Sequence, residues 1–130
     1  MNIPTDLKYA QTDEWVKVDG NIATIGVSDY AQDALSDIVY FEAIVAIGDT
    51  VTAGQQICTL ESVKAAADVN SSVSGTVIAV NEDLANAPET VNQDPYDKAW
   101  MIKIELTTPA ELEKLLDAAA YSQYPESRSH

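Results

Sequence analysis

The stretch Thr59-Leu60-Glu61-Ser62-Val63-Lys64-Ala65-Ala66-Ala67-Asp68-Val69 holds two short runs of strand-like residues, and the few residues between them must reverse the chain. A strand that ends at Glu61 and another that begins near Ala66 would form a hairpin with a tight turn. Lys64 would then lie at the tip, between small or apolar neighbours. This spacing predicts a lysine that a modifying enzyme can reach, although an ordinary solvated charge would satisfy the same spacing.

The sequence on both sides of this turn predicts further short strands. Turn signals, which are single glycines, prolines or polar residues, separate the runs 15–18, 22–27, 38–43, 57–61, 66–69, 76–81 and 100–106. In the last run, alternate apolar residues from Trp100 to Leu106 mark one face, and Trp100 is expected to anchor the core. Strands of this number and length predict a mainly β protein, a small sandwich or flattened barrel over about 22–106.

Two helices are expected beside the strands. Ser28 can cap a short helix near 29–36, whose apolar positions include Ala31 and Leu35. Thr108-Pro109-Ala110-Glu111 has the pattern of a capping box with proline at the first helical position. Leucines at helical spacing follow it, so a C-terminal helix is predicted over about 109–120. The pattern fades over 122–130, which we expect to be flexible.

Length and charge narrow the class of protein. A chain of 130 residues fits one domain, 1–130, and no apolar run approaches the ~20 residues that span a membrane. The net charge of −14 would repel a phosphate backbone, so nucleic-acid binding is not expected. The N-terminus has no secretory signal, which favours a bacterial cytoplasm, with a processed mitochondrial form as the alternative.

Residues suited to catalysis are scarce. The one histidine is His130, so neither a Ser-His-Asp nor a Cys-His arrangement has a base, and zinc lacks its usual ligands. The single cysteine, Cys58, falls in an apolar strand pattern and is expected to be a buried structural thiol. Adjacent acids such as Asp13 and Glu14 are expected to point to opposite faces or to water. We therefore predict no catalytic residue, no metal site and a non-enzymatic protein.

The lysine turn resembles the lipoylation site of the glycine cleavage system H-protein family. The resemblance lies in Glu61-Ser62-Val63-Lys64-Ala65, followed by Asp68-Val69-Asn70-Ser71. It extends to 7–9, 14–16, 23–26, Gly75 and 100–104. It implies a barrel-sandwich hybrid fold, with lipoate as the cofactor in amide linkage to Lys64.

The resemblance also implies roles for four further residues. Glu61 and Gly75 match positions associated with recognition by lipoylating enzymes. Glu14 and Asp68 match acids that lie near the aminomethyl-bearing arm in the family. Our hypothesis is that both carboxylates hold the cationic amine, and plain surface acids are the alternative.

The partners that the family implies are enzymes of glycine cleavage. The chain would receive an aminomethyl group from glycine decarboxylase, which uses pyridoxal phosphate, and pass it to a tetrahydrofolate-dependent aminomethyltransferase. Dihydrolipoyl dehydrogenase would reoxidise it, a lipoate ligase or lipoyl transferase would modify it, and the free chain would be a monomer. A lipoyl-relay protein of another pathway, a biotinyl domain and an unmodified interaction module remain alternatives.

Overall fold

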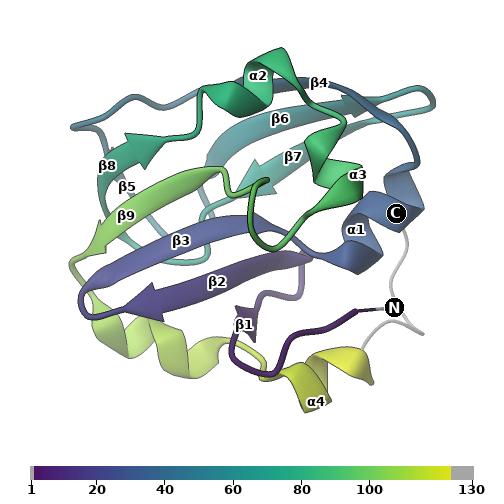
Figure 1. Ribbon diagram of the computed structural model, residues 1–130. Helices are drawn as coiled ribbons and strands as arrows, with labels where there is room; N and C mark the ends of the chain where they lie inside the picture. The colour runs from purple at the N-terminus through teal and green to yellow at the C-terminus, as the bar shows by residue number, and fades with distance from the viewer. Residues whose placement is uncertain (1, 124–130) are drawn as a thin grey trace.

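Two antiparallel sheets form the body of the protein in the computed structural model, which describes residues 2–123. The larger sheet has the order β1 (Lys8–Tyr9), β2 (Glu14–Asp19), β3 (Ile22–Val27), β9 (Ile102–Leu106), β8 (Gly75–Val80) and β5 (Thr50–Val51). The smaller sheet has the order β4 (Ile38–Ala43), β6 (Gln56–Ser62) and β7 (Ala66–Asn70). Short helices border the sheets (Figure 1): α1 (Asp29–Leu35), α2 (Asp83–Asn86), α3 (Thr90–Gln93) and α4 (Ala118–Ser122). The prediction of a mainly β sandwich is confirmed.

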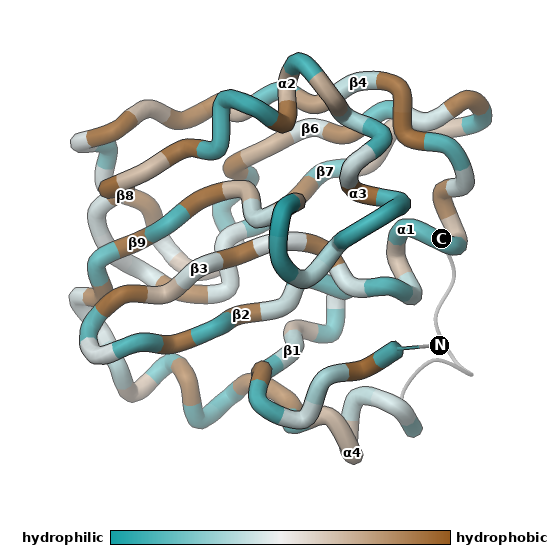
Figure 2. Tube along the Cα trace, viewed as in Figure 1, coloured by the Kyte–Doolittle hydropathy of each residue, from teal (hydrophilic) through white to brown (hydrophobic). Residues whose placement is uncertain are grey.

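The main core lies between the two sheets. Alternation of apolar and polar residues along the strands, visible along β9 in Figure 2, turns one face of each sheet inward. Ile25 and Ile104 come from the larger sheet and Leu60 from the smaller one, and all three are almost completely buried. Because β1 and β2 belong to the larger sheet, the barrel starts earlier than the predicted residue 22.

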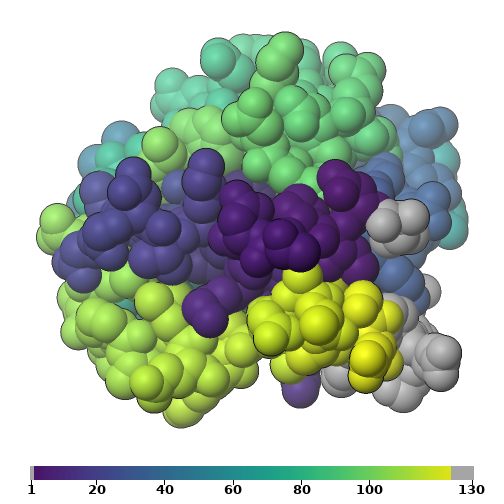
Figure 3. Space-filling model, turned by 60° about the horizontal axis from the view of Figure 1, so that its bottom comes forward, coloured from purple at the N-terminus to yellow at the C-terminus, as the bar shows by residue number. Residues whose placement is uncertain are grey.

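A second, smaller core joins the two ends of the described chain. It contains Leu7, Tyr9, Trp15, Ala118 and Tyr121. The rings of Tyr9 and Tyr121 are stacked, with centroids 4.5 Å apart and planes 7° apart. The N-terminal segment and α4 therefore lie side by side on the surface, as Figure 3 shows.

The start of α1 follows the prediction closely. Ser28 precedes the helix, and its hydroxyl oxygen accepts a hydrogen bond from the Ala31 backbone N–H at 3.2 Å. Ala31 and Leu35 are the buried residues of this helix. The predicted cap and the predicted helix near 29–36 are confirmed.

The predicted continuous helix over 109–120 is wrong in its bounds. A 3-10 helix, η1 (Pro109–Lys114), ends at an extended Leu115, and α4 follows after a break. At the break, Leu116 pairs with Tyr9 through two backbone hydrogen bonds of 2.8 Å. The chain gives up helical bonds there because bonding to β1 satisfies the same backbone groups.

The predicted capping box does not form either. Thr108 makes no side-chain capping bond, and the Glu111 carboxylate instead accepts bonds from the Ser74 backbone N–H at 2.7 Å and the Ser74 hydroxyl at 2.8 Å. A contact over 37 positions of sequence thus replaces the local one. Of the predicted flexible tail 122–130, residues 124–130 lie outside the described part of the chain, and Ser122 ends α4.

Trp100 does not anchor the core, contrary to expectation. It follows a turn before β9 and is half-buried at the edge of the smaller core, with the Lys103 ammonium 5.1 Å from its ring centroid. Met101 is fully buried in its place, and its backbone N–H bonds to the Ile25 carbonyl at 2.8 Å. In residues 2–123, no helix is long and apolar enough to cross a membrane.

Candidate functional site

The turn between β6 and β7 is tied together by Ser62. The Ser62 backbone N–H donates to the Ala65 carbonyl at 2.7 Å. The Ser62 hydroxyl oxygen accepts from the backbone N–H groups of Lys64 at 3.3 Å and Ala65 at 3.0 Å. Serine hydroxyls stabilise tight turns in this way. The hairpin extends beyond the body of the molecule at the upper right of Figure 1, so the turn is both ordered and prominent.

Lys64 is exposed at the tip of this hairpin. The neighbouring Val63 is 67% exposed, and its backbone N–H bonds to the Asp37 carbonyl at 3.1 Å, which fixes the tip to the start of β4. Within residues 2–123, the Lys64 side chain makes no ion pair or hydrogen bond. The amine is therefore open to acylation, and the site fits an amide-linked group.

The two predicted recognition residues are placed very differently. Glu61 is exposed on β6 and pairs with Ala66 across the hairpin, close to Lys64. Gly75 is buried at the start of β8, beyond the far end of β7. A Cβ atom there would overlap the Glu105 carbonyl and lie 2.6 Å from Ile104 Cγ2. The structure thus brings Glu61 to the lysine and gives Gly75 a packing role.

Glu14 is buried, with only 1% of its surface exposed. Its carboxylate accepts hydrogen bonds from the Asn70 backbone N–H at 3.2 Å and from the Thr12 hydroxyl. Burial raises the pKa of Glu14 to about 7. The alternative of a plain surface acid is therefore wrong for Glu14.

Asp13 is buried as well, at 1% exposed, so of the two expected orientations, opposite faces or water, the exposure to water is wrong for both acids. Its carboxylate accepts a hydrogen bond from the Tyr121 hydroxyl at 2.7 Å. Sequence reasoning missed Tyr121, because 108 positions separate the two residues and no local pattern marks the contact. The turn role of Ser62 was also missed, although a serine two residues before the tip is a recognisable signal.

Asp68 is exposed on β7, where its carboxylate accepts a hydrogen bond from the Gln56 amide at 2.9 Å. Asp68 and Asn70 are two residues apart on one strand, so they point to the same side at a spacing of ~7 Å. The Glu14 carboxylate reaches β7 from β2 and binds the backbone N–H of Asn70, two residues farther from the lysine tip than Asp68. The structure therefore brings the carboxylate of Glu14, which belongs to β2, to the strand that carries Asp68.

Cys58 is fully buried in the main core, as predicted. Burial raises the pKa of its thiol to about 12, so the thiolate is scarce at neutral pH. A structural role for this cysteine is consistent with both observations.

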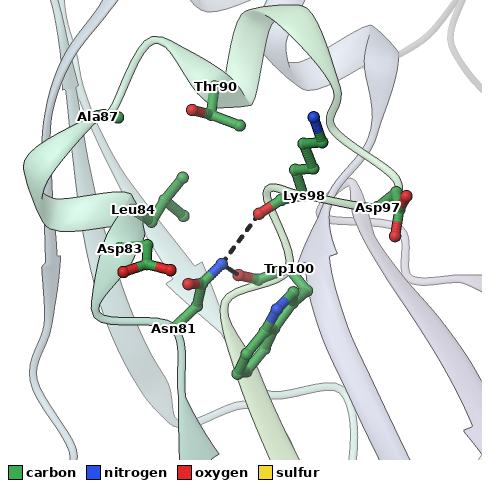
Figure 4. A pocket seen from close by; sticks show the side chains of 8 residues that line it. All are labelled: Asn81, Asp83, Leu84, Ala87, Thr90, Asp97, Lys98 and Trp100. Carbon is green, nitrogen blue, oxygen red and sulfur yellow. Dashed lines mark hydrogen bonds between the residues drawn. The ribbon is translucent and has the colours of Figure 1, made fainter.

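A separate hollow lies between α2, α3 and the loop before β9 (Figure 4). Its volume is about 420 Å³, and it is lined by Asn81, Asp83, Leu84, Ala87, Thr90, Asp97, Lys98 and Trp100. The Asn81 amide crosses its floor and donates to the carbonyls of Lys98 at 3.0 Å and Trp100 at 2.7 Å. These bonds close the loop onto β8, and Lys64 does not line the hollow. The candidate site is therefore the hairpin.

Comparisons with known proteins agree on one family. A family model described as "Glycine cleavage H-protein" matches residues 7–128. A glycine cleavage system H protein of Carboxydothermus hydrogenoformans is 48% identical over 124 residues, 95% of each chain. A mitochondrial H protein of Arabidopsis thaliana is 50% identical over 121 residues, 93% of this chain and 77% of the relative. The crystal structure of an H protein from Mycobacterium marinum matches with a TM-score of 0.84 and 29% identity, over 93% of this chain and 97% of that one.

A two-sheet barrel with one exposed lysine on a tight hairpin defines a carrier domain, the class that presents a covalently attached group to enzymes. The chain belongs to the glycine cleavage H-protein family, as its sequence resemblance predicted. This is a family of lipoyl-bearing carrier subunits, and membership implies the other components of the glycine cleavage system. The structural match also confirms the barrel-sandwich fold class.

Proposed function

We propose that this chain carries the aminomethyl group of glycine, on a lipoyl group attached at Lys64, from the decarboxylase to the aminomethyltransferase. Dihydrolipoyl dehydrogenase then reoxidises the carrier. The observation that supports this most directly is the exposed Lys64 amine on a turn held by Ser62. Attachment in amide linkage removes the lysine charge and leaves a long tether, which makes encounter with a docked enzyme effectively intramolecular.

A lipoate ligase or lipoyl transferase would recognise the backbone conformation of the hairpin and the residues beside its tip. Glu61 is exposed next to the turn and is available for direct contact. Gly75 would contribute indirectly, because it allows β8 to approach β9 closely and so supports the barrel that presents the hairpin. The chain itself provides no catalytic group in this proposal.

When bound, the lipoyl group supplies the disulfide that accepts the aminomethyl group. Glu14 and Asp68 would then hold the amine of the loaded arm along β7. Glu14 provides a carboxylate shielded from water, where an ammonium group would be bound more strongly than at the surface. Asp68 provides an exposed carboxylate nearer the lysine tip, so the two acids would guide and retain the arm between visits to enzymes.

Intact-mass measurement tests the attachment. Incubation with a lipoate ligase, ATP and lipoate should add one lipoyl increment, which Lys64→Arg abolishes. Lys17→Arg is the matched control, because Lys17 is also exposed on a strand but lies on β2. A biotin increment under biotinylating conditions, or no increment at all, would support the alternative modules. Glycine-dependent exchange of carbon dioxide with the decarboxylase then separates glycine cleavage from a lipoyl relay in another pathway.

The lifetime of the loaded carrier tests the two acids. Glu14→Gln and Asp68→Asn should each release the aminomethyl group to water several-fold faster than the unaltered chain. Asp19→Asn, at the exposed end of β2, should have no effect. An unchanged lifetime in both Glu14→Gln and Asp68→Asn would refute the proposed contacts while leaving the attachment at Lys64 intact.

A further inference from the structure

A chain of hydrogen bonds runs from α1 to the acid pair through the C-terminal helix. The Ala31 backbone N–H donates to the Ser28 hydroxyl oxygen at 3.2 Å. Ser28 Oγ and the Tyr121 hydroxyl are 2.6 Å apart, and the Tyr121 hydroxyl lies 2.7 Å from Asp13 Oδ1. All of Asp13, Ser28 and Tyr121 are at most 1% exposed.

The number of protons on each hydroxyl determines which group donates in each of these hydrogen bonds. The Tyr121 hydroxyl has one proton, which it donates to Asp13 Oδ1. The Ser28 hydroxyl must therefore donate to the Tyr121 oxygen, while its own oxygen accepts from Ala31. Every donor points toward Asp13, and hydrogen bonds aligned in this way reinforce one another.

Asp13, the last acceptor of this series of hydrogen bonds, lies in a strained turn that leads into β2. Asp13 has a φ of 77°, a left-handed conformation that is uncommon for a residue with a side chain. Its backbone N–H donates to the Ala10 carbonyl at 3.0 Å, and the Ala10 N–H donates to the Glu14 carbonyl at 2.9 Å. Glu14 is the first residue of β2 after this turn, and its carboxylate accepts a hydrogen bond from the Asn70 backbone N–H at 3.2 Å.

We propose that Tyr121 is a positioning residue, whose hydroxyl holds Asp13 in its left-handed turn and thereby keeps the Glu14 carboxylate against the edge of β7. The C-terminal helix α4 would thus control the position of Glu14, which lies near the other end of the sequence. The stacking of Tyr121 on Tyr9 fixes the ring, so the hydroxyl has little freedom to move away from Asp13. The role of Glu14 toward the loaded arm rests on the proposed function, whereas its position does not.

Tyr121→Phe tests the hydroxyl, because it keeps the stacked ring. Tyr96→Phe is the matched control: the Tyr96 hydroxyl also makes two bonds, to the Asp29 N–H at 2.9 Å and the Asn2 carbonyl at 2.6 Å, and its ring packs on the same smaller core. Neither of those bonds involves Asp13. Tyr121→Phe should lose more stability, because its bonds are buried and one reaches a carboxylate, so the comparison depends on the acid pair, which Tyr121→Phe alone should disturb.

The readout is NMR of the unmodified protein. Tyr121→Phe should displace the Asn70 amide resonance and change the titration midpoint of the Glu14 carboxyl by about half a pH unit or more. Tyr96→Phe should leave both signals in place. If Tyr121→Phe leaves both unchanged, or if the two variants change them equally, the positioning role is refuted and Tyr121 is only a core residue. Because no lipoyl group is needed, this result is independent of the Glu14→Gln lifetime that tests the arm contact.

Discussion

Glu14 begins β2 with its carboxylate removed from water and bound by Thr12 and Asn70. Burial disfavours the charged form and raises the pKa to about 7, and the charge of Asp13 contributes in the same direction, while the hydrogen bonds from Thr12 and Asn70 oppose the shift. A group that titrates near neutral pH responds sensitively to a cation beside it. The surroundings of Glu14 thus give its carboxyl group a pKa that suits the binding of a cation at neutral pH.

The raised pKa of Glu14 makes the folded protein less stable as pH rises. Between its ordinary pKa near 4.5 and about 7, the folded state keeps a proton that the unfolded state has lost, so the free energy of unfolding falls with pH across this window. The whole loss amounts to at most about 3 kcal/mol. Urea denaturation from pH 4.5 to 8 should show a flatter profile for Glu14→Gln. Asp19→Asn should keep the original slope, and an equal slope in Glu14→Gln would contradict the shift.

Gly75 offers a second test at the scale of the residue. Gly75→Ala places a Cβ against the Glu105 carbonyl and Ile104, where backbone has to move, so we expect a loss of roughly 2–4 kcal/mol in the free energy of unfolding. Gly20→Asn is the control, because Gly20 has a φ of 62° with open space around it and asparagine tolerates that conformation. A stable Gly75→Ala protein that is no longer lipoylated would instead favour direct recognition of the glycine.

Among the elements, the β6–β7 hairpin combines fixed strands with an exposed tip. Its strands are fixed in the smaller sheet, with Leu60 and Val69 buried in the core, yet its tip carries the exposed Val63 and Lys64. Ser62 connects the two properties, since its hydroxyl binds the backbone of the turn itself. A rigid hairpin with an open tip is what a modifying enzyme needs in order to grip one lysine among several.

Loss of the Ser62 hydroxyl should loosen the turn without unfolding the hairpin. We expect Ser62→Ala to lower stability by about 1 kcal/mol and to slow lipoylation of Lys64 by lipoate ligase, because the tip spends less time in the shape that the ligase binds. Ser62→Thr keeps the hydroxyl and should retain most of the rate. Equal rates of modification for Ser62→Ala and the unaltered chain, measured by mass, would show that order in the turn is unimportant.

The whole molecule carries a net charge of −14, and this charge acts over a longer range than any single contact. A carrier that visits several enzymes needs rapid and reversible encounters. A strongly acidic surface can accelerate encounters with basic patches through electrostatic steering. The contribution would lie in the association rate rather than in tight binding.

Salt should therefore slow the association of the chain with its enzymes. Raising ionic strength from about 0.05 to 0.5 M shortens the screening length severalfold, and we expect the association rate constant with the decarboxylase to fall at least tenfold. The dissociation rate constant should change much less. Stopped-flow fluorescence measures both, and an association rate that is independent of salt would exclude steering.

Local patterns in the sequence were sufficient to predict most of the strands, the first helix and the lysine turn of this protein. The strands with alternating apolar residues, the Ser28 cap and the exposed lysine turn all depend on residues within a few positions of one another, and each was predicted. The place of Lys64 needed no tertiary information, because a short turn between two buried strands has to project into solvent.

Tertiary structure decided what local patterns could not express. Glu14 is buried because Asn70, 56 positions away, supplies a hydrogen bond, and the C-terminal helix is broken because Leu116 bonds to Tyr9. In both places a distant partner satisfies a polar group that would otherwise turn to water or to its own helix. The energy of such contacts depends on which segments meet in the folded chain, so the sequence by itself determined the hairpin and its lysine, and only the fold determined the acids beside it.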